Sequence, residues 1–233
     1  MPTETYAQRR RQLETYFDRT AVEAWKRLTS DAPVSGIRAT VRAGRDTMRA
    51  TLLDWLPADL SGKRLLDAGC GTCALAVEAA RRGAHVTAVD LSANLVELAQ
   101  ERINGDFGSG HIDFRVGDMF DPAFGDFDHV VGMDSLIHYR ASDIVRVLAG
   151  MASRTRGSIL VTFAPSSAFL LAFLAVGRLV PRGDRSPAIA PVAEKKLRQL
   201  IARDPAFAGW ESARTLKVAR GFYTSQALEI KRS

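Results

Sequence analysis

The amino-acid sequence predicts an α/β fold in which a mostly parallel sheet is covered by helices on both faces. Short apolar stretches typical of buried strands alternate with segments whose apolar residues recur every three or four positions. A glycine-rich turn joins the first such strand to the first helix after it. Parallel strands need a crossover between them, usually a helix, so this alternation indicates repeated strand–helix–strand units.

Length and composition agree with this fold class. The chain has 233 residues, of which 46% are apolar and 25% charged, and these values are ordinary for a globular protein. One large domain with appendages is expected, and disorder or a polytopic membrane protein is not. We place an N-terminal helical cap at 1–57 and the main domain at 58–233.

The first 57 residues are expected to form helices ahead of the sheet. Apolar residues from Tyr6 to Leu28 follow a helical period. A proline and a glycine within 31–36 end this helix. A second helix carries Met48 and Leu52 on one face, and a proline ends it in turn.

From there on, strands and helices alternate. Strands are expected over 64–69, 84–90, 111–116, 127–133 and 158–163, with 210–218 and 222–230 as an antiparallel pair that completes a seven-stranded sheet. Helices are expected over 74–82, 93–103, about 144–151 and 191–203. Ser92 and Ser142 are the expected N-caps of two of them. Residues 166–190 interrupt the order as a helical insertion that begins with a strongly apolar run, which suits a substrate lid, although such a run is also typical of an ordinary buried helix.

The turn after the first strand contains Asp67, Gly69, Cys70 and Gly71. Glycine lets the backbone approach a ligand closely, and the start of the following helix favours electron-rich groups. Nicotinamide and flavin proteins use a similar turn, so the turn alone does not identify the ligand. Cys73 stands where the third glycine of the dinucleotide pattern would be.

Acidic residues at the ends of the next strands narrow the choice of ligand. Asp90 is expected to accept hydrogen bonds from two ribose hydroxyls, although an acid at this spacing is also a nicotinamide signature. Asp118 is expected to accept a hydrogen bond from an adenine amino group, and the backbone amide of Met119 to donate one to a ring nitrogen. Asp134 lies where a ligand ammonium would be. Three carboxylates without a phosphate-pairing lysine favour a cationic ligand such as S-adenosylmethionine.

Four segments, Leu66–Gly71, Val89–Leu91, Val116–Met119 and Phe127–Asp134, resemble the motifs of class I S-adenosylmethionine-dependent methyltransferases. The resemblance covers residues 64–164 and implies a Rossmann-like fold with S-adenosylmethionine as cofactor. The cofactor-binding residues it implies are Asp67, Gly69, Cys70, Gly71, Asp90, Leu91, Asp118, Met119 and Asp134. Members usually carry glycine at the position of Cys73, and we expect a slightly wider turn here. Both cysteines are expected to be packing residues, and no metal site is expected, because zinc would need two further ligands.

The flanking segments resemble the magnesium-protoporphyrin IX O-methyltransferases of chlorophyll and bacteriochlorophyll synthesis, from about Tyr16 to Ile230. Tyr16–Arg27 and Ser135–Tyr139 are the most specific pieces. The resemblance implies methylation of the ring-C propionate of magnesium protoporphyrin IX, with S-adenosylhomocysteine as the other product. It also implies association with photosynthetic membranes and cooperation with the porphyrin-binding subunit of magnesium chelatase. The resemblance also implies that Tyr16 and His138 are catalytic residues.

The expected chemistry needs alignment more than a strong base. A propionate is ionised near neutral pH, so holding it in line with the methyl group and excluding water supply the rate. His138 is expected to orient the carboxylate, or to take its proton if the acid enters protonated. Tyr16 is expected to close over the cofactor. Substrate contacts are expected from Arg42, Arg45, Tyr139, Phe169 and Phe173.

The net charge of +6 is unevenly distributed, with +4 on residues 1–50, −5 on 51–175 and +7 on 176–233. Basic surfaces suit anionic lipid, nucleic acid or an acidic substrate, although a charged surface that only keeps the protein soluble explains the pattern equally well. No motif of nucleic-acid recognition is present, so no nucleic-acid partner is expected. The chain shows no secretory signal, and its longest apolar run is too short to span a bilayer. A cytoplasmic protein with peripheral membrane contact is expected.

Three other functions remain open at this point. The first is a related methyltransferase that acts on another small acid or phenol, such as a quinone precursor. Turnover with magnesium protoporphyrin, compared with turnover on a quinone precursor, tests this alternative. A nucleic-acid-binding protein would give a salt-sensitive band shift with RNA. A cofactor-binding scaffold without catalysis would show no turnover.

Overall fold

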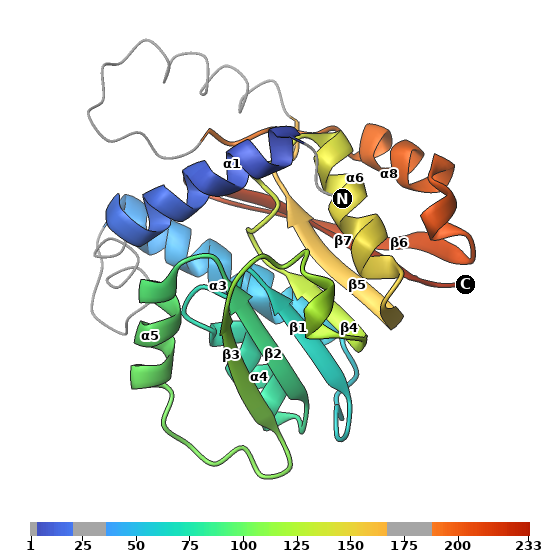
Figure 1. Ribbon diagram of the computed structural model, residues 1–233. Helices are drawn as coiled ribbons and strands as arrows, with labels where there is room; N and C mark the ends of the chain where they lie inside the picture. The colour runs from blue at the N-terminus through green and yellow to red at the C-terminus, as the bar shows by residue number, and fades with distance from the viewer. Residues whose placement is uncertain (1–3, 21–35, 167–187) are drawn as a thin grey trace.

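The computed structural model describes residues 4–20, 36–166 and 188–233 (Figure 1). Its seven-stranded sheet has the order β3-β2-β1-β4-β5-β7-β6. The strands are β1 (Arg64–Ala68), β2 (His85–Asp90), β3 (His111–Val116), β4 (Phe127–Gly132), β5 (Thr155–Phe163), β6 (Trp210–Arg220) and β7 (Tyr223–Arg232). β1 to β5 are parallel, whereas β7 runs antiparallel to β5 and to β6. The predicted mostly parallel sheet and its antiparallel closing pair are confirmed.

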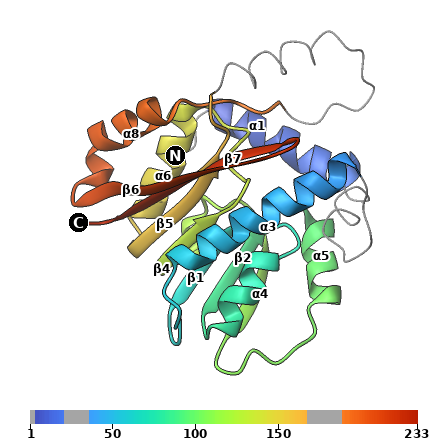
Figure 2. The ribbon, with the colours of Figure 1, turned by 180° about the vertical axis from the view of Figure 1, so that it is seen from behind.

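Helices cover both faces of the sheet. They are α1 (Glu4–Thr15), α3 (Ile37–Trp55), α4 (Ala74–Arg81), α5 (Ala93–Arg102), α6 (Ala141–Ala152) and α8 (Glu194–Arg203), with a π-helical turn η1 (Tyr16–Thr20) and 3-10 turns η2 (Pro122–Phe124) and η3 (Pro205–Phe207). Figures 1 and 2 show α6 and α8 on one face of the sheet and α3 and α4 on the other. Buried apolar residues form one cluster on each side. Among the described helices, none combines the length and apolar composition needed to cross a bilayer.

Local capping agrees with the prediction at one helix and differs at another. Ser92 caps α5, since its Oγ accepts a hydrogen bond from the Leu95 N–H at 3.3 Å. Ser142 does not cap α6. That helix begins at Ala141, and its N-cap residue is Arg140, two positions before Ser142, without a side-chain hydrogen bond. The prediction of Ser142 as N-cap is wrong, because this residue lies within the first turn of the helix.

The N-terminal helix α1 lies across the carboxyl ends of the strands (Figure 1). Thr5 Oγ1 donates to Asp143 of α6 at 3.1 Å. The Tyr6 hydroxyl and Arg10 Nη1 both donate to Asp118, which follows β3, at 2.6 and 3.0 Å. These contacts hold the extension over the edge of the sheet where ligands bind in such folds. The predicted insertion at 166–190, with Phe169 and Phe173, lies almost wholly outside the described residues.

Candidate functional site

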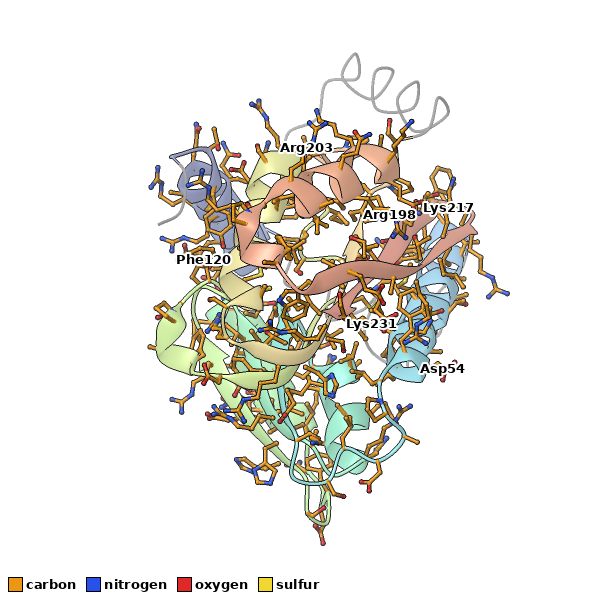
Figure 3. The ribbon with its side chains drawn as sticks, turned by 90° about the vertical axis from the view of Figure 1, so that its right-hand side faces the viewer. Asp54, Phe120, Arg198, Arg203, Lys217 and Lys231 are labelled. Atoms are coloured by element: carbon orange, nitrogen blue, oxygen red, sulfur yellow. The ribbon has the colours of Figure 1, made fainter. Side chains whose placement is uncertain are left out.

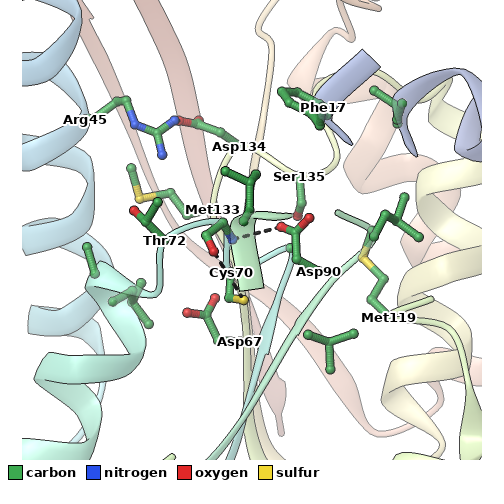
Figure 4. A pocket seen from close by; sticks show the side chains of 18 of the residues that line it. Phe17, Arg45, Asp67, Cys70, Thr72, Asp90, Met119, Met133, Asp134 and Ser135 are labelled. Atoms are coloured by element: carbon green, nitrogen blue, oxygen red, sulfur yellow. Dashed lines mark hydrogen bonds and ion pairs between the residues drawn. The ribbon is translucent and has the colours of Figure 1, made fainter. Parts of the chain in front are cut away.

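A cavity of about 480 Å³ opens at the carboxyl ends of the parallel strands (Figure 4). Its wall consists of the turn after β1, the ends of β2 and β4, one face of α3 and the loop before α6. The predicted site residues that line it are Arg42, Arg45, Asp67, Gly69, Cys70, Gly71, Asp90, Leu91, Met119, Asp134, His138 and Tyr139. The structure therefore brings most of the sequence-predicted residues into one cavity.

The turn after β1 has the left-handed backbone that glycine favours. Gly69 and Gly71 have φ of 80° and 55°, and Cys73 has φ of 60°. A Cβ at Gly69 would lie 2.5 Å from Cβ of Ser135, so only glycine fits there. Cys73 is fully buried and bears the cost of a left-handed residue with a side chain, about 1 kcal/mol. The chain thus replaces the usual glycine by placing cysteine in the same backbone region.

Asp90 is held rigidly at the end of β2. Its Oδ2 accepts from the Gly71 N–H at 2.8 Å, and its Oδ1 accepts from the Ser92 N–H at 2.9 Å. Burial raises its pKa, and these amide donors oppose the rise. A carboxylate has about four acceptor positions, and two are used here. Both oxygens therefore keep acceptor capacity for a diol in the cavity.

Asp67 is the most unusual carboxyl group of the cavity. It is 2% exposed, and its Oδ2 has no hydrogen-bond partner among the described residues. Burial, and then the charge of Asp90, raise its pKa to about 7. The buried hydroxyl of Ser135 also lacks a hydrogen-bond partner there. Buried polar atoms are nearly always hydrogen-bonded in native proteins, so two such atoms on one cavity indicate a polar ligand.

Asp134 lines the cavity, but its carboxylate is already bound within the protein. Oδ2 accepts from Arg45 Nη1 at 2.7 Å, and Oδ1 accepts from the hydroxyls of Tyr223, Ser225 and Thr162 at 3.0 to 3.3 Å. The close-up shows the guanidinium of Arg45 turned toward Asp134 (Figure 4). The role of Asp134 as acceptor of a ligand ammonium stays a prediction that this arrangement does not support. Among the described residues, Asp67 Oδ2 is a buried carboxylate oxygen at this cavity without a hydrogen-bond partner.

Asp118 does not line the cavity, contrary to the expectation that it reads an adenine amino group. Its Oδ1 accepts from the Tyr6 hydroxyl and from the Phe120 N–H, and its Oδ2 accepts from Arg10. Desolvation and the nearby carboxylate raise the pKa of Tyr6, so this hydroxyl stays protonated and donates. In this arrangement Asp118 attaches α1 to the sheet, and Met119 lines the cavity instead.

The cavity roof comes from the N-terminal extension, but through different residues than expected. Leu13 and Phe17 line the cavity, whereas Tyr16 does not. Tyr16 packs edge-on against Phe17, with ring centroids 5.2 Å apart. Leu13 and Phe17 are four residues apart and share a helix face, whereas Tyr16, next to Phe17, is turned away from that face. A direct role for Tyr16 at the reacting groups stays a prediction that this arrangement does not support.

His138 lies under this roof. It is 7% exposed and lines the cavity, and the Phe17 ring approaches its imidazole at 6.2 Å between centroids. Its loop connects β4 to α6 and also carries Ser135 and Tyr139. Phe17 shields this part of the cavity from water, and a desolvated imidazole beside a cofactor turn is suited to orient a carboxylate or exchange a proton.

The cavity has one charged wall and one apolar end. Arg42, Arg45 and Arg49 recur at helical spacing on α3 and all line the cavity. Arg49 pairs with Asp46 at 2.8 Å. The opposite end is lined by Leu91, Leu95, Gly117 and Met119. Such a cavity suits a ligand with a flat apolar ring at one end and charged groups at the other.

Comparisons with known proteins agree with this geometry. The family described as magnesium-protoporphyrin IX methyltransferase C-terminus matches residues 132–232, and a methyltransferase-domain family matches residues 65–157. The magnesium-protoporphyrin O-methyltransferase of Rhodobacter capsulatus is 51% identical, over 99% of this chain and 100% of the relative. A ubiquinone biosynthesis O-methyltransferase of Xanthomonas oryzae is 38% identical, over 56% of this chain and 58% of its own length.

A solved structure is similar over nearly its whole length. The crystal structure of magnesium protoporphyrin IX methyltransferase from Synechocystis PCC 6803 with bound S-adenosylhomocysteine has a TM-score of 0.82 to this chain. The two are 27% identical, and the match covers 96% of this chain and 99% of the solved one.

Proposed function

The chain belongs to the family of magnesium-protoporphyrin IX O-methyltransferases, and from this premise we propose how its residues carry out the reaction. It transfers a methyl group from S-adenosylmethionine to magnesium protoporphyrin IX and releases S-adenosylhomocysteine, a step of chlorophyll and bacteriochlorophyll biosynthesis. Identity of 51% across both whole chains carries this assignment. The quinone-precursor alternative is not favoured, because relatives of that kind are 38% identical over 56% of the chain or 31% identical over 73%, against 51% over 99% here.

The cavity fits S-adenosylmethionine. The unpartnered Asp67 Oδ2 suits the ammonium, Asp90 suits the ribose hydroxyls, and the apolar end around Met119 suits the adenine. Arginines of α3 suit the cofactor carboxylate or a substrate propionate, and Arg42 and Arg45 remain the proposed substrate contacts together with Tyr139. When bound, the cofactor supplies an electrophilic methyl group on a sulfonium.

The acceptor is proposed to be the ring-C propionate, held by His138 in the loop after β4. Because a propionate is already ionised near neutral pH, His138 mainly orients its oxygen. Phe17 and Leu13 exclude water from the same space, which strengthens these interactions. A methyl-transfer assay with magnesium protoporphyrin IX, metal-free protoporphyrin and a quinone precursor in parallel tests the proposal. Turnover restricted to the quinone precursor would contradict it.

Asp67→Asn is expected to stabilise the cofactor-free protein at pH 8. In the folded chain the pKa of Asp67 is about 7, against an ordinary value of 3.8. Between these values the folded protein keeps a proton that the unfolded chain has released, so its free energy of unfolding falls as pH rises from about 4 to 7. The full difference is at most about 4 kcal/mol. An amide does not ionise and avoids this loss.

Melting curves at pH 5 and pH 8 check this prediction, since the gain from Asp67→Asn grows with pH. In the same variant the ammonium meets a neutral amide in place of a carboxylate, and we expect about tenfold weaker S-adenosylmethionine binding by calorimetry. Asp54→Asn, at an exposed position of α3, is the matched control and changes neither quantity. Equal melting shifts at the two pH values would contradict the buried, proton-holding role of Asp67.

Peripheral membrane contact is proposed at the rim of the cavity. Ile37 and Phe222 are 56% and 60% exposed, and the adjacent Arg38 and Arg220 are also exposed. The two apolar residues come from the start of α3 and the β6–β7 turn, which meet because Gly221 packs on Thr40. Apolar side chains beside arginines favour an anionic bilayer surface. The porphyrin-binding subunit of magnesium chelatase stays a proposed partner that rests on the resemblance.

Phe222→Asp is expected to lower sedimentation with anionic phospholipid vesicles several-fold, because it replaces an apolar anchor by a charge that the surface repels. Turnover on detergent-solubilised porphyrin should stay near the wild-type value. Ala58→Asp, exposed between α3 and β1, adds the same charge at the opposite end of the sheet and serves as the control. Equal sedimentation of all three proteins would exclude this rim as the contact.

Part of the basic charge near the C-terminus serves the fold itself. Figure 3 shows Arg198 and Lys217 on the side of the molecule formed by α8 and the β6–β7 hairpin. Arg198 donates to Glu194 and to the carbonyls of Ser212 and Ala213. Arg214 is paired with Glu229 at 2.6 Å. Arg198 thus joins α8 to the hairpin, and Arg214 joins the two strands of the hairpin, so the charge pattern gives little support to nucleic-acid binding.

A further inference from the structure

The C-terminal hairpin binds a carboxylate that lines the active-site cavity. Tyr223 and Ser225 begin β7, and both hydroxyls donate to Asp134 Oδ1, at 3.0 and 3.1 Å. Neither residue lines the cavity. Asp134, by contrast, lines the cavity and begins the loop that carries His138. Hydrogen bonds from the hairpin therefore reach the reaction site at Asp134.

Asp134 is held in a backbone conformation that is unfavourable for a residue with a side chain. Its φ is 57°, and its N–H donates to Thr162 Oγ1 at 2.7 Å. A left-handed non-glycine residue costs of order 1 kcal/mol and persists only where its surroundings determine it. Four donors from α3, β5 and β7 converge on the Asp134 carboxylate and supply that constraint.

The packing of α3 makes room for Tyr223. A Cβ at Gly44 would lie 2.5 Å from the Tyr223 ring, so the helix carries glycine where the ring lies against it. Glycine inside a helix costs about 1 kcal/mol relative to alanine. Gly44 directly precedes Arg45, whose Nη1 binds the other oxygen of Asp134. Figure 2 shows the β6–β7 hairpin passing beside α3, which agrees with this contact.

We propose that Tyr223 is a positioning residue of the methyl transfer, acting through Asp134. Its hydroxyl helps fix the left-handed turn at Asp134, and this turn sets where His138 and the Arg45 guanidinium lie. Burial and the charge of Asp134 raise the pKa of Tyr223, so the hydroxyl remains a donor at all working pH values. This inference rests on the proposed role of the loop after β4 in the reaction.

Tyr223→Phe tests the proposal, because it removes only the hydroxyl and keeps the ring against Gly44. We expect kcat to fall about five- to tenfold, while KM for magnesium protoporphyrin and Kd for S-adenosylhomocysteine stay within about threefold. Ser225→Ala should act in the same direction. Thr215→Val is the matched control, since it removes another hairpin hydroxyl, which donates to the Ala227 carbonyl away from the site. It should lower stability without changing kcat.

A double-mutant cycle on kcat distinguishes a positioning role of Tyr223 from a role in stability alone. In Asp134→Ala the oxygens that accept from the hairpin hydroxyls are absent, so adding Tyr223→Phe should not lower kcat further. Wild-type kcat in Tyr223→Phe, or losses that multiply in the double variant, would overturn the inference. An inactive wild-type chain on magnesium protoporphyrin would instead overturn the proposed function, so the two failures are distinguishable.

Discussion

His138→Ala is expected to lower the turnover number at least tenfold while S-adenosylhomocysteine binding stays within a few-fold of wild type. The imidazole is buried on the cavity wall beneath Phe17, in the loop that follows Asp134. A positioned orienting or acid–base group typically supplies a factor of about 100 or more, so tenfold is a lower bound. Loss of a group used only in the transition state lowers kcat and kcat/KM together.

Steady-state assays with saturating cofactor and porphyrin measure this effect. His111→Ala, at an exposed position at the start of β3, is the matched control and should keep wild-type turnover. The pH profile of the wild-type enzyme separates the two roles of His138. An orienting imidazole gives a shallow dependence near its ordinary pKa of about 6.5, whereas an obligatory base gives a full unit slope below its pKa. Undiminished turnover in His138→Ala would remove this residue from the mechanism.

The parts of the fold that could be predicted from sequence are those with a local signal. The strands and helices from Arg64 onward follow from hydrophobic period and turn residues, and their observed bounds differ from the predicted ones by a few residues. Ser92 could be identified as a cap because capping depends on residues three positions apart. The cavity residues in the turn after β1 and at the end of β2 could be identified because parallel strands bring their carboxyl ends together.

The residues that were missed depend on contacts between distant parts of the chain. Tyr6 donates to the carboxylate of Asp118, 112 positions away, which was predicted to contact adenine. Arg45 and Tyr223 each lie 89 positions from Asp134, and both donate to the carboxylate that was predicted to receive a ligand ammonium. No period or spacing in the sequence reports such pairs. Gly44 was a local signal of close packing against α3, because glycine is unfavourable inside a helix unless another group needs the space.

Asp90→Ala is expected to weaken S-adenosylhomocysteine binding at least about tenfold. Its carboxylate has acceptor capacity for both ribose hydroxyls, and each charge-assisted hydrogen bond contributes about 1.5 to 3 kcal/mol. The substitution also leaves the N–H groups of Gly71 and Ser92 without their acceptor, which loosens the turn that carries the cofactor. Both effects act on cofactor binding before any chemical step, so Kd is the quantity that changes most.

Calorimetry with S-adenosylhomocysteine on folded protein measures this loss directly. Asp113→Ala is the matched control, since this exposed carboxylate of the neighbouring strand β3 pairs only with Arg115 among the described residues. Asp90→Asn separates the two contributions. It keeps one acceptor oxygen and replaces the other by an NH₂ group, which cannot accept from an amide. It should therefore bind more weakly than wild type and lose part of the support of the turn. If Asp90→Ala binds S-adenosylhomocysteine as tightly as wild type, the ribose does not lie at the end of β2, and the cofactor orientation argued from Asp67 and Met119 must be reversed.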